Sequence, residues 1–299
     1  MGERVKAWIP DATAVRDFRT SPERFRLRHR QHLRRPGWHA PTDGGRAFHA
    51  ALTDWFGREV SDVEAAVAAL RAAWGPVAAF DPRADQLATF ERTLRAYAAR
   101  WPREADGFAV EATEQYVEGR IARAGVAFDW CGIVDRRVRF ADGTRAIMDT
   151  KTTSGWFHTA KTAGFFEQHE TSEAMLGYLA LEQALDRDTA VYYIDAIHIE
   201  DGGTCKPERD FQRWRCPGIV AGWRLDRWAR DIAWTLGQIA ALDAERGPDE
   251  PWPVYTNWGW NKPDEYQALV MAAPELAAGE MAAFERRAWV PREVANDHA

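Results

Sequence analysis

The pattern of apolar and polar residues in the middle of the chain predicts a β-hairpin. Residues 126–140 alternate as a strand does, and residues 145–150 continue as a second strand. Between them, residues 141–144 read Ala-Asp-Gly-Thr and carry the Asp-Gly turn signal. A short apolar run at 108–113 precedes the hairpin, and a longer one at 190–199 follows it. The pattern therefore predicts four strands.

Helical spacing predicts the elements around these strands. Apolar residues recur at helical intervals over residues 46–56, 63–74 and 87–101, and again over 171–181 between the hairpin and the last strand. A long helix is predicted at 218–245, with one apolar face made of Leu225, Trp228, Ile232, Leu236 and Ile239. The order is helix, three strands, helix, strand, with helical additions at both ends. This order indicates the α/β class.

Length and composition favour one compact unit. The chain has 299 residues, of which 46% are hydrophobic, enough to bury a substantial core. We expect a single domain over residues 1–299 with three consecutive parts. These are a helical part at 1–105, a core at 106–200, and a helical part with a frayed tail at 201–299.

Two further features bear on where the protein works. We expect no membrane association and a cytoplasmic location, because no apolar run approaches the length of a bilayer and the first residues lack a signal-peptide core. The three cysteines are too few and too scattered for a disulfide framework, so we expect reduced thiols: Cys131, Cys205 and Cys216.

Two acids and a lysine fall on the predicted hairpin. Residues 132–135 read Gly-Ile-Val-Asp, and residues 147–151 read Ile-Met-Asp-Thr-Lys. Asp149 and Lys151 leave the same face of a strand, and Asp135 can lie beside them if the register allows it. Two carboxylates at one place repel each other unless a cation lies between them, and hard oxygen ligands suit Mg²⁺ or Mn²⁺. This trio is what a metal-dependent phosphodiesterase needs.

An Asp-x-Lys triplet alone occurs by chance about once in a chain of this length. Here it ends an apolar strand, follows a second acid, and precedes the loop sequence Thr-Thr-Ser-Gly at 152–155. The ordered set resembles the core of the PD-(D/E)XK nuclease superfamily, particularly its RecB-like branch. The resemblance implies a restriction-endonuclease-like core, a central mixed sheet flanked by helices. It also implies that Asp135, Asp149 and the Thr150 carbonyl hold Mg²⁺ (or Mn²⁺), and that Lys151 positions the water.

Flanking segments extend the resemblance. Residues 45–52 resemble the Gly-x-x-x-His helix of RecB-like nucleases, which implies that His49 completes the metal site. Without the resemblance, His49 would more often be an ordinary helix residue. Residues 171–181 resemble the helix with the branch's Gln-x-x-x-Tyr motif. Tyr178 matches the Tyr, but Ala174 stands where the family has Gln.

An acid on the first strand can join the metal site in related nucleases. We take Glu111 as that residue. Glu114 and Glu118 compete with it, and each of the three acids is otherwise a solvated surface residue.

Nucleic acid must meet a local basic patch, because the net charge of the chain is −6. Residues 16–35 supply one, since they contain Arg19, Arg24, Arg26, Arg28, Arg30, Arg34 and Arg35. We take Arg26, Arg28 and Arg30, with Lys161 in the loop after the Asp-Thr-Lys strand, as nucleic-acid contacts. The alternative is a solvated helix face whose acidic partners lie elsewhere in the fold.

Taken together, the sequence predicts a magnesium-dependent DNA nuclease, an exonuclease acting on DNA ends in recombination, repair or phage replication. Two alternatives are kept: a CRISPR-associated adaptation nuclease that has lost its iron-sulfur cluster, and a DNA-binding protein that keeps the fold without turnover. No cluster is predicted, because residues 253–262 contain none of the cysteines that such relatives carry there. The expected partner is DNA, with a recombination protein or a second copy as further candidates.

Overall fold

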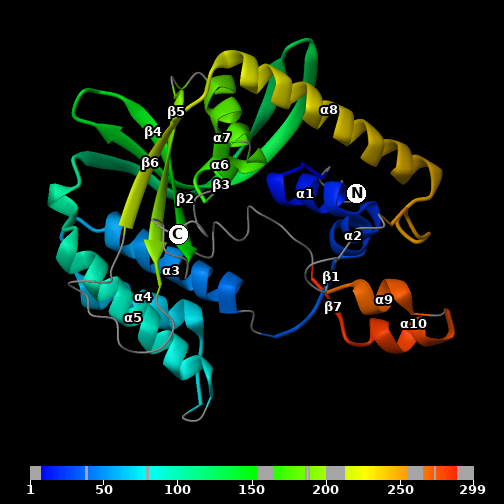
Figure 1. Ribbon diagram of the computed structural model, residues 1–299, viewed down its shortest axis with the longest axis horizontal. Coiled ribbons are helices and arrows are strands. Elements are labelled where there is room, and N and C mark those ends of the chain that lie inside the picture. The colour runs from blue at the N-terminus through cyan, green and yellow to red at the C-terminus, as the bar shows by residue number, and fades with distance from the viewer. Residues whose placement is uncertain are drawn as a thin grey trace, which may run out of the picture. The chain divides into compact units, whose positions relative to one another are not determined.

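The computed structural model describes residues 8–37, 40–78, 81–153, 165–170, 172–185, 187, 189–199, 213–254, 265–272 and 274–287 (Figure 1). The chain forms two compact units. Unit 1 comprises residues 1–37, 118–132 and 222–291, and unit 2 comprises residues 38–117, 133–221 and 292–299. Neither unit is one continuous stretch of sequence, because residues 1–37 and 222–291 join the same unit. The division into three consecutive parts stays a prediction.

A mixed sheet forms the centre of the fold, as predicted, but it has five strands where the sequence predicted four. Its strands are β2 (Phe108–Arg123), β3 (Val126–Phe140), β4 (Arg145–Thr153), β5 (Val191–His198) and β6 (Arg213–Ile219), in the order β2-β3-β4-β5-β6. β3 and β4 are antiparallel, β4 and β5 are parallel, and β5 and β6 are antiparallel. The parallel pair requires a crossover connection, and the chain supplies it with helices.

Tight turns close the two hairpins of the sheet. At the predicted Asp-Gly turn, Gly143 has a φ of 85°, and the backbone of Thr144 donates to the carboxylate of Asp142 at 2.8 Å. Between β2 and β3, Ala124 and Gly125 have φ angles of 51° and 80°, the conformation of a two-residue hairpin turn whose twist matches the strands.

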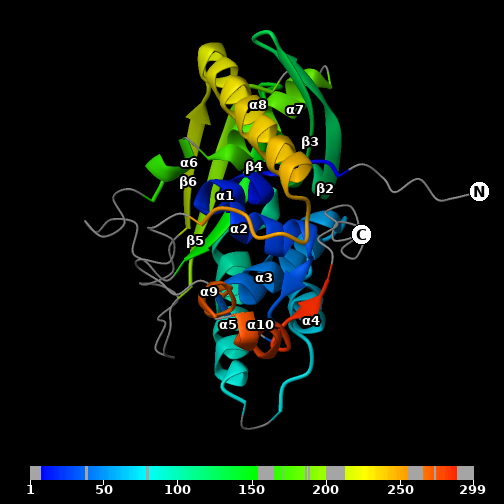
Figure 2. The same ribbon diagram turned by 90° about the vertical axis from the view of Figure 1, so that its right-hand side faces the viewer.

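Helices cover both faces of the sheet in unit 2. They are α3 (Ala40–Gly57), α4 (Val63–Trp74), α5 (Arg83–Arg100), the 3₁₀ turn Arg103–Ala105, α6 (Glu167–Glu170) and α7 (Glu173–Ala184). Adjacent side chains of β3 point to opposite faces of the sheet. On one face, the guanidinium of Arg136 lies over the ring of Phe56 on α3. On the other face, Arg137 pairs with Glu182 on α7. α3, α4 and α5 lie side by side in both views (Figures 1 and 2) and share an apolar cluster that includes Phe48, Leu70 and Tyr97.

Unit 1 combines residues 1–37 and 222–291 with residues 118–132 of the β2–β3 hairpin. It contains α1 (Ala12–Thr20), α2 (Pro22–Phe25), a π-helical turn (Arg26–Arg30), α8 (Gly222–Glu245), α9 (Gln267–Met271) and α10 (Pro274–Met281). A short antiparallel pair joins β1 (Leu33–Arg34) to β7 (Glu285–Arg286). The apolar face predicted for α8 is buried at Leu225, Trp228, Ile232 and Ile239. No helix among the described residues is both long enough and apolar enough to cross a membrane.

A buried carboxylate organises the N-terminal segment of unit 1. The side chain of Asp17 is in contact with Arg24 at 2.8 Å, His29 at 2.8 Å and Arg28 at 3.3 Å. Burial opposes the charged form, but the hydrogen bond with His29 and the charges of both arginines outweigh it. They hold the pKa of Asp17 well below its usual range.

This ion-pair cluster predicts an acid-sensitive fold. Replacing Asp17 with Asn leaves two cations without their carboxylate, so Asp17→Asn should lower the free energy of unfolding by about 3 kcal/mol near neutral pH. Because the native pKa of Asp17 is lowered, its contribution is present above the unfolded pKa of about 4 and is lost below it. Urea unfolding at neutral and acid pH should show the difference between the two proteins shrinking in acid.

The exposed pair of Arg120 and Asp129, 3.4 Å apart in the same unit, provides the control. Asp129→Asn should change the free energy of unfolding by about 0.5 kcal/mol or less. An equal loss for Asp17→Asn and Asp129→Asn would show that burial of the Asp17 cluster is not what stabilises this segment.

Candidate metal centre

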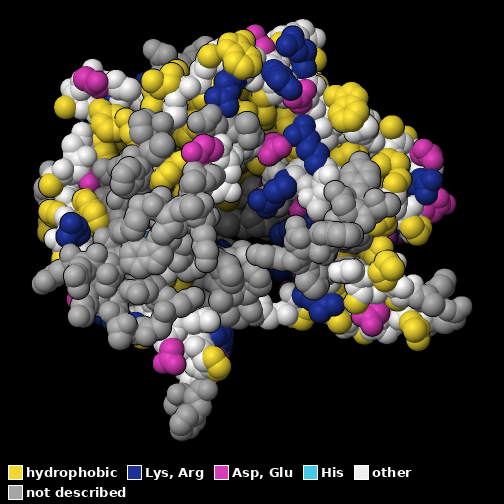
Figure 3. Space-filling view, viewed as in Figure 1, with side chains coloured by type: hydrophobic (Ala, Val, Ile, Leu, Met, Phe, Trp, Pro, Cys, Tyr) yellow, Lys and Arg dark blue, Asp and Glu magenta, His cyan; other side chains and the backbone are white. Residues whose placement is uncertain are grey.

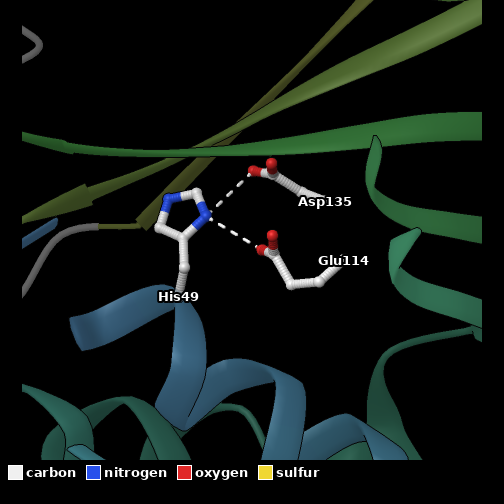
Figure 4. A group of neighbouring side chains, drawn as sticks. All are labelled: His49, Glu114 and Asp135. Atoms are coloured by element: carbon white, nitrogen blue, oxygen red, sulfur yellow. Dashed lines mark hydrogen bonds and ion pairs between the residues drawn. The ribbon is translucent and has the colours of Figure 1, made fainter. Parts of the chain in front are cut away.

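Three side chains from three elements of unit 2 converge at one point (Figure 4). They are His49 of α3, Glu114 of β2 and Asp135 of β3, and their ligand atoms all lie within 4.8 Å of one another. Nδ1 of His49 is 3.3 Å from Oε1 of Glu114 and 3.3 Å from Oδ2 of Asp135. The imidazole therefore occupies the place between two carboxylates where a cation belongs.

Glu114 reaches this point because β2 is irregular there. Its backbone has a φ of 43°, a left-handed conformation that is uncommon for any residue with a β-carbon. The alternation of exposed and half-buried residues along β2 breaks off over residues 112–114. Backbone strain of this kind is concentrated at functional sites, where it aims a side chain that a regular strand would point elsewhere.

The hairpin opens beside the same point. Regular pairing of β3 with β4 runs from Arg139 and Arg145 to Arg136 and Met148, one residue short of Asp135 and Asp149. Beyond it, the carboxylate of Asp135 accepts the backbone N–H of Thr150 at 2.8 Å. The two acids thus stand where the strands separate, and a small hollow there is lined by His49, Glu114, Asp135 and Thr150, among others.

Asp149 and Lys151 form an ion pair next to this group. Nζ of Lys151 is 2.5 Å from Oδ2 of Asp149, which is buried, whereas the lysine is half exposed. Burial raises the pKa of Asp149, and the negative charge of Asp135 adds to the effect, while Lys151 and His49 oppose it. Asp149 is therefore close enough to Asp135 and His49 to feel their charges.

The charge of the carboxylates also acts on His49. Burial disfavours its charged form, but Asp135 and Glu114 raise the pKa of His49 to about 9. In the metal-free protein the imidazole is protonated at neutral pH and neutralises its neighbours. A divalent ion would take over that role with the same donors, since oxygen-rich sets with one imidazole suit Mn²⁺ and Mg²⁺. The donor set fits a divalent metal.

A buried ion pair lies behind the site. Nη2 of Arg136 donates to Oδ2 of Asp195 at 2.7 Å and to the hydroxyl of Thr150 at 2.6 Å. Only 2% of the Arg136 side chain and none of the Asp195 side chain are exposed to solvent. The pair joins β3 and β5 to β4 through Thr150, the residue whose backbone also holds Asp135.

Other sequence-predicted residues lie apart from this group or outside the description. Glu111 pairs with Arg139 and Arg145 at 2.5 and 3.4 Å, so the structure favours Glu114 over Glu111 as the acid contributed by β2. Tyr178 is half-buried on α7. Its role at the site stays a prediction. Lys161 lies outside the described residues.

The arginines predicted to contact nucleic acid are paired with acids inside unit 1. Arg26 bonds Glu23 at 2.6 Å and is nearly fully buried. Arg28 pairs with Asp17, and Arg30 pairs with Asp243 at 2.6 Å while its guanidinium lies over the rings of Trp8 and Phe25. These contacts favour a structural role. Only Arg30 has its acidic partner elsewhere in the fold, as the alternative expected, because the acids that pair with Arg26 and Arg28 lie in the same N-terminal segment. Nucleic-acid contact by the three arginines stays a prediction.

Two residues near the site were missed from the sequence. Glu114 was considered only as a competitor of Glu111, although regular alternation would place the two acids on opposite faces of the strand. His169 of α6 lies close enough to Lys151 and Asp149 to feel their charges, and burial together with Lys151 lowers its pKa. Its Nε2 is buried and has no hydrogen-bond partner among the residues that the structure describes. Neither residue belongs to a motif, so spacing alone could not have selected it.

One of three comparisons with known proteins identifies the family of the chain. A family model described as the PD-(D/E)XK nuclease superfamily matches residues 12–246. None of the curated proteins compared with the chain matches it. A solved structure described as "Crystal structure of SSO0001" is 12% identical in sequence to this chain. The match covers 87% of this chain and 96% of the chain in that structure. Its TM-score of 0.32 is too low to support any argument.

The position of Glu114 predicts that substitutions at Glu114 and Glu111 differ in their effect on metal binding. Glu114→Gln removes a charged oxygen ligand, so it should weaken Mn²⁺ binding about tenfold or more. Glu111→Gln, on the same strand, should leave Mn²⁺ affinity unchanged. Titration calorimetry with both purified variants measures the Mn²⁺ affinities. A larger loss of affinity for Glu111→Gln than for Glu114→Gln would identify Glu111 as the ligand.

The ion pair behind the site predicts a second effect on metal affinity. Thr150→Val keeps the strand but removes the hydroxyl that Arg136 holds, so Mn²⁺ affinity should fall about tenfold. Thr150→Ser keeps the hydroxyl and should bind Mn²⁺ like the wild type. If Val and Ser variants bind the ion equally well, the Arg136 contact does not position the site.

Proposed function

The chain belongs to the PD-(D/E)XK nuclease superfamily, and on that premise we propose that it is a Mg²⁺- or Mn²⁺-dependent nuclease that hydrolyses phosphodiester bonds in DNA. The observation that carries the proposal is the convergence of His49, Glu114 and Asp135 beside the Asp149–Lys151 pair. Carboxylates, an imidazole and an ammonium at one place are the groups that metal-assisted phosphodiester hydrolysis requires.

The metal would be held by Asp135, Glu114, Asp149 and His49, with the carbonyl of Thr150. When bound, a divalent ion offsets charge on a phosphate and makes a bound water a better nucleophile. Imidazole is a better ligand for Mn²⁺ than for Mg²⁺, whereas carboxylates suit both. We therefore propose that Mn²⁺ supports activity at least as well as Mg²⁺.

Lys151 would act on the phosphate itself. Its ammonium is half exposed, and its contact with Asp149 holds it at the edge of the site. In this position it can orient the attacking water and neutralise negative charge as the transition state forms. His169 is close to the same pair, and its Nε2 has no partner within the described part of the chain, so it is a further group able to contact the substrate or the water.

We further propose that the chain is an exonuclease of the RecB-like branch, acting on DNA ends in recombination, repair or phage replication. The Gly-x-x-x-His segment supports the branch, because His49 of that segment reaches the two acids. A second candidate is a DNA-binding protein without turnover. Ala174 favours it, since this residue stands where the family's Gln would contact the substrate or the lysine.

The direct test is cleavage of DNA by the purified full-length chain. End-labelled linear DNA and closed circular DNA are incubated with Mg²⁺, with Mn²⁺, and with neither. We expect metal-dependent degradation of the linear form and survival of the circle. Cutting of the circle would make the protein an endonuclease, and binding without cleavage of either form would favour the DNA-binding alternative.

A substitution at Lys151 separates catalysis from binding. Lys151→Ala should lower single-turnover cleavage about 100-fold or more, because charge on the phosphate is no longer offset. Metal and DNA should still bind, as measured with Ca²⁺ in place of the active ion. Lys151→Arg should restore little, since the planar guanidinium cannot occupy the same point. Equal rates for wild type and Lys151→Ala would exclude this role.

A further inference from the structure

One face of α8 carries two arginines between two tryptophans. We call Trp223, Arg227, Arg230 and Trp234 the α8 stripe. At 100° per residue these four side chains fall within an arc of about 60°. The arc lies opposite the buried face that contains Leu225, Ile232 and Ile239. The stripe therefore points away from the core of unit 1, and apolar and basic side chains gather together over α8 in Figure 3.

The two tryptophans of the stripe are the most exposed tryptophans among the described residues of unit 1. Trp223 is 65% exposed and Trp234 is 67% exposed, whereas Trp8 is 38% exposed and Trp130, Trp228 and Trp252 are buried. Isolated apolar residues are common on protein surfaces, but two indoles aligned on one helix face expose a large aromatic area to water. Such an arrangement is typical of a binding surface.

The arginines of the stripe are also unlike those near the N-terminus. Arg24, Arg26 and Arg28 are committed to acids of their own unit. Arg227 is 75% exposed and only approaches Asp231 at 3.9 Å, a distance at which an exposed pair contributes little. Arg230 is exposed and makes no ion pair with any residue that the structure describes. The stripe thus presents basic charge on a chain with a net charge of −6.

We propose that the α8 stripe binds single-stranded DNA, with bases stacked on Trp223 and Trp234 and phosphates held by Arg227 and Arg230. Aromatic platforms interleaved with cations match the two repeating groups of a single strand. Eleven residues separate the tryptophans, about 16 Å along the helix axis, which leaves room for several nucleotides. A duplex hides its base faces in the stack and could use only the arginines. This inference rests on the proposed nuclease function and names the form of its substrate.

The tryptophans are tested by binding of a dye-labelled single-stranded oligonucleotide, followed by anisotropy with Ca²⁺ as the only divalent ion. The double variant Trp223→Ala/Trp234→Ala should weaken binding about 30-fold or more, because each stacked base contributes to affinity. The matched control is Met271→Ala/Leu276→Ala, which removes two exposed apolar side chains of the same unit and should leave binding unchanged.

The arginines are tested by the salt dependence of the same binding. Arg227→Gln/Arg230→Gln should reduce the slope of log affinity against log salt by about 1.4, since each lost phosphate contact on a single strand is worth about 0.7. Arg120→Gln removes an exposed arginine of unit 1 outside the stripe and should leave the slope unchanged.

The inference is overturned if the tryptophan variant binds the single strand as tightly as the wild type. It is also overturned if duplex binding falls equally, or if the stripe variants change only self-association, which would identify a protein partner. If the wild type cleaves DNA and the stripe variants bind single-stranded DNA as well as the wild type does, the proposed nuclease function stands and the stripe has no part in it. Wild-type protein that neither binds nor cleaves any DNA form would contradict both proposals.

Discussion

The buried pair of Arg136 and Asp195 is the constraint on which the metal centre depends. A buried charge without its partner is costly, so β3 and β5 must take the positions that let these two side chains meet. A slip of one residue would turn each side chain to the opposite face of the sheet. The same guanidinium holds the hydroxyl of Thr150, and the backbone of Thr150 holds Asp135. One ion pair thereby fixes the register of three strands. Through Thr150 it also fixes the position of the Asp135 carboxylate.

The site concentrates negative charge in a way that works against folding. Glu114, Asp135 and Asp149 lie close together, Asp149 is buried, and Glu114 adopts a strained backbone. His49 and Lys151 supply two positive charges that partly balance the three acids. Protein groups thus fulfil, in the metal-free state, part of what a divalent ion would do. Residues selected for stability alone would not be arranged like this, and the strain at Glu114 supports a functional reading.

Much of the unit 2 fold could be predicted, because its signals are local. The alternation over residues 126–140, the Asp-Gly turn and the helical spacing of 63–74 each arise from neighbours in sequence, and the elements formed where expected. β6 was missed, since Pro217 and Gly218 within it are unfavourable for a strand. Glu114 escaped prediction because a single left-handed residue reverses the face of a strand. The contacts of Arg26 with the carbonyl of Pro248 and of Arg30 with Asp243 could not be anticipated, since each joins residues more than 200 positions apart.

That last separation has a consequence for how the protein is made. The N-terminal helices of unit 1 depend on α8, through contacts such as Arg19 with Thr235 and Arg30 with Asp243. On a ribosome that adds about 5 to 20 residues per second, α8 is synthesised about 10 to 40 s after the arginines it will contact. All of unit 2 except residues 292–299 is synthesised in that interval. The basic N-terminal segment therefore lacks several of its partners until the sheet has been synthesised. Unit 1 can be completed only near the end of translation.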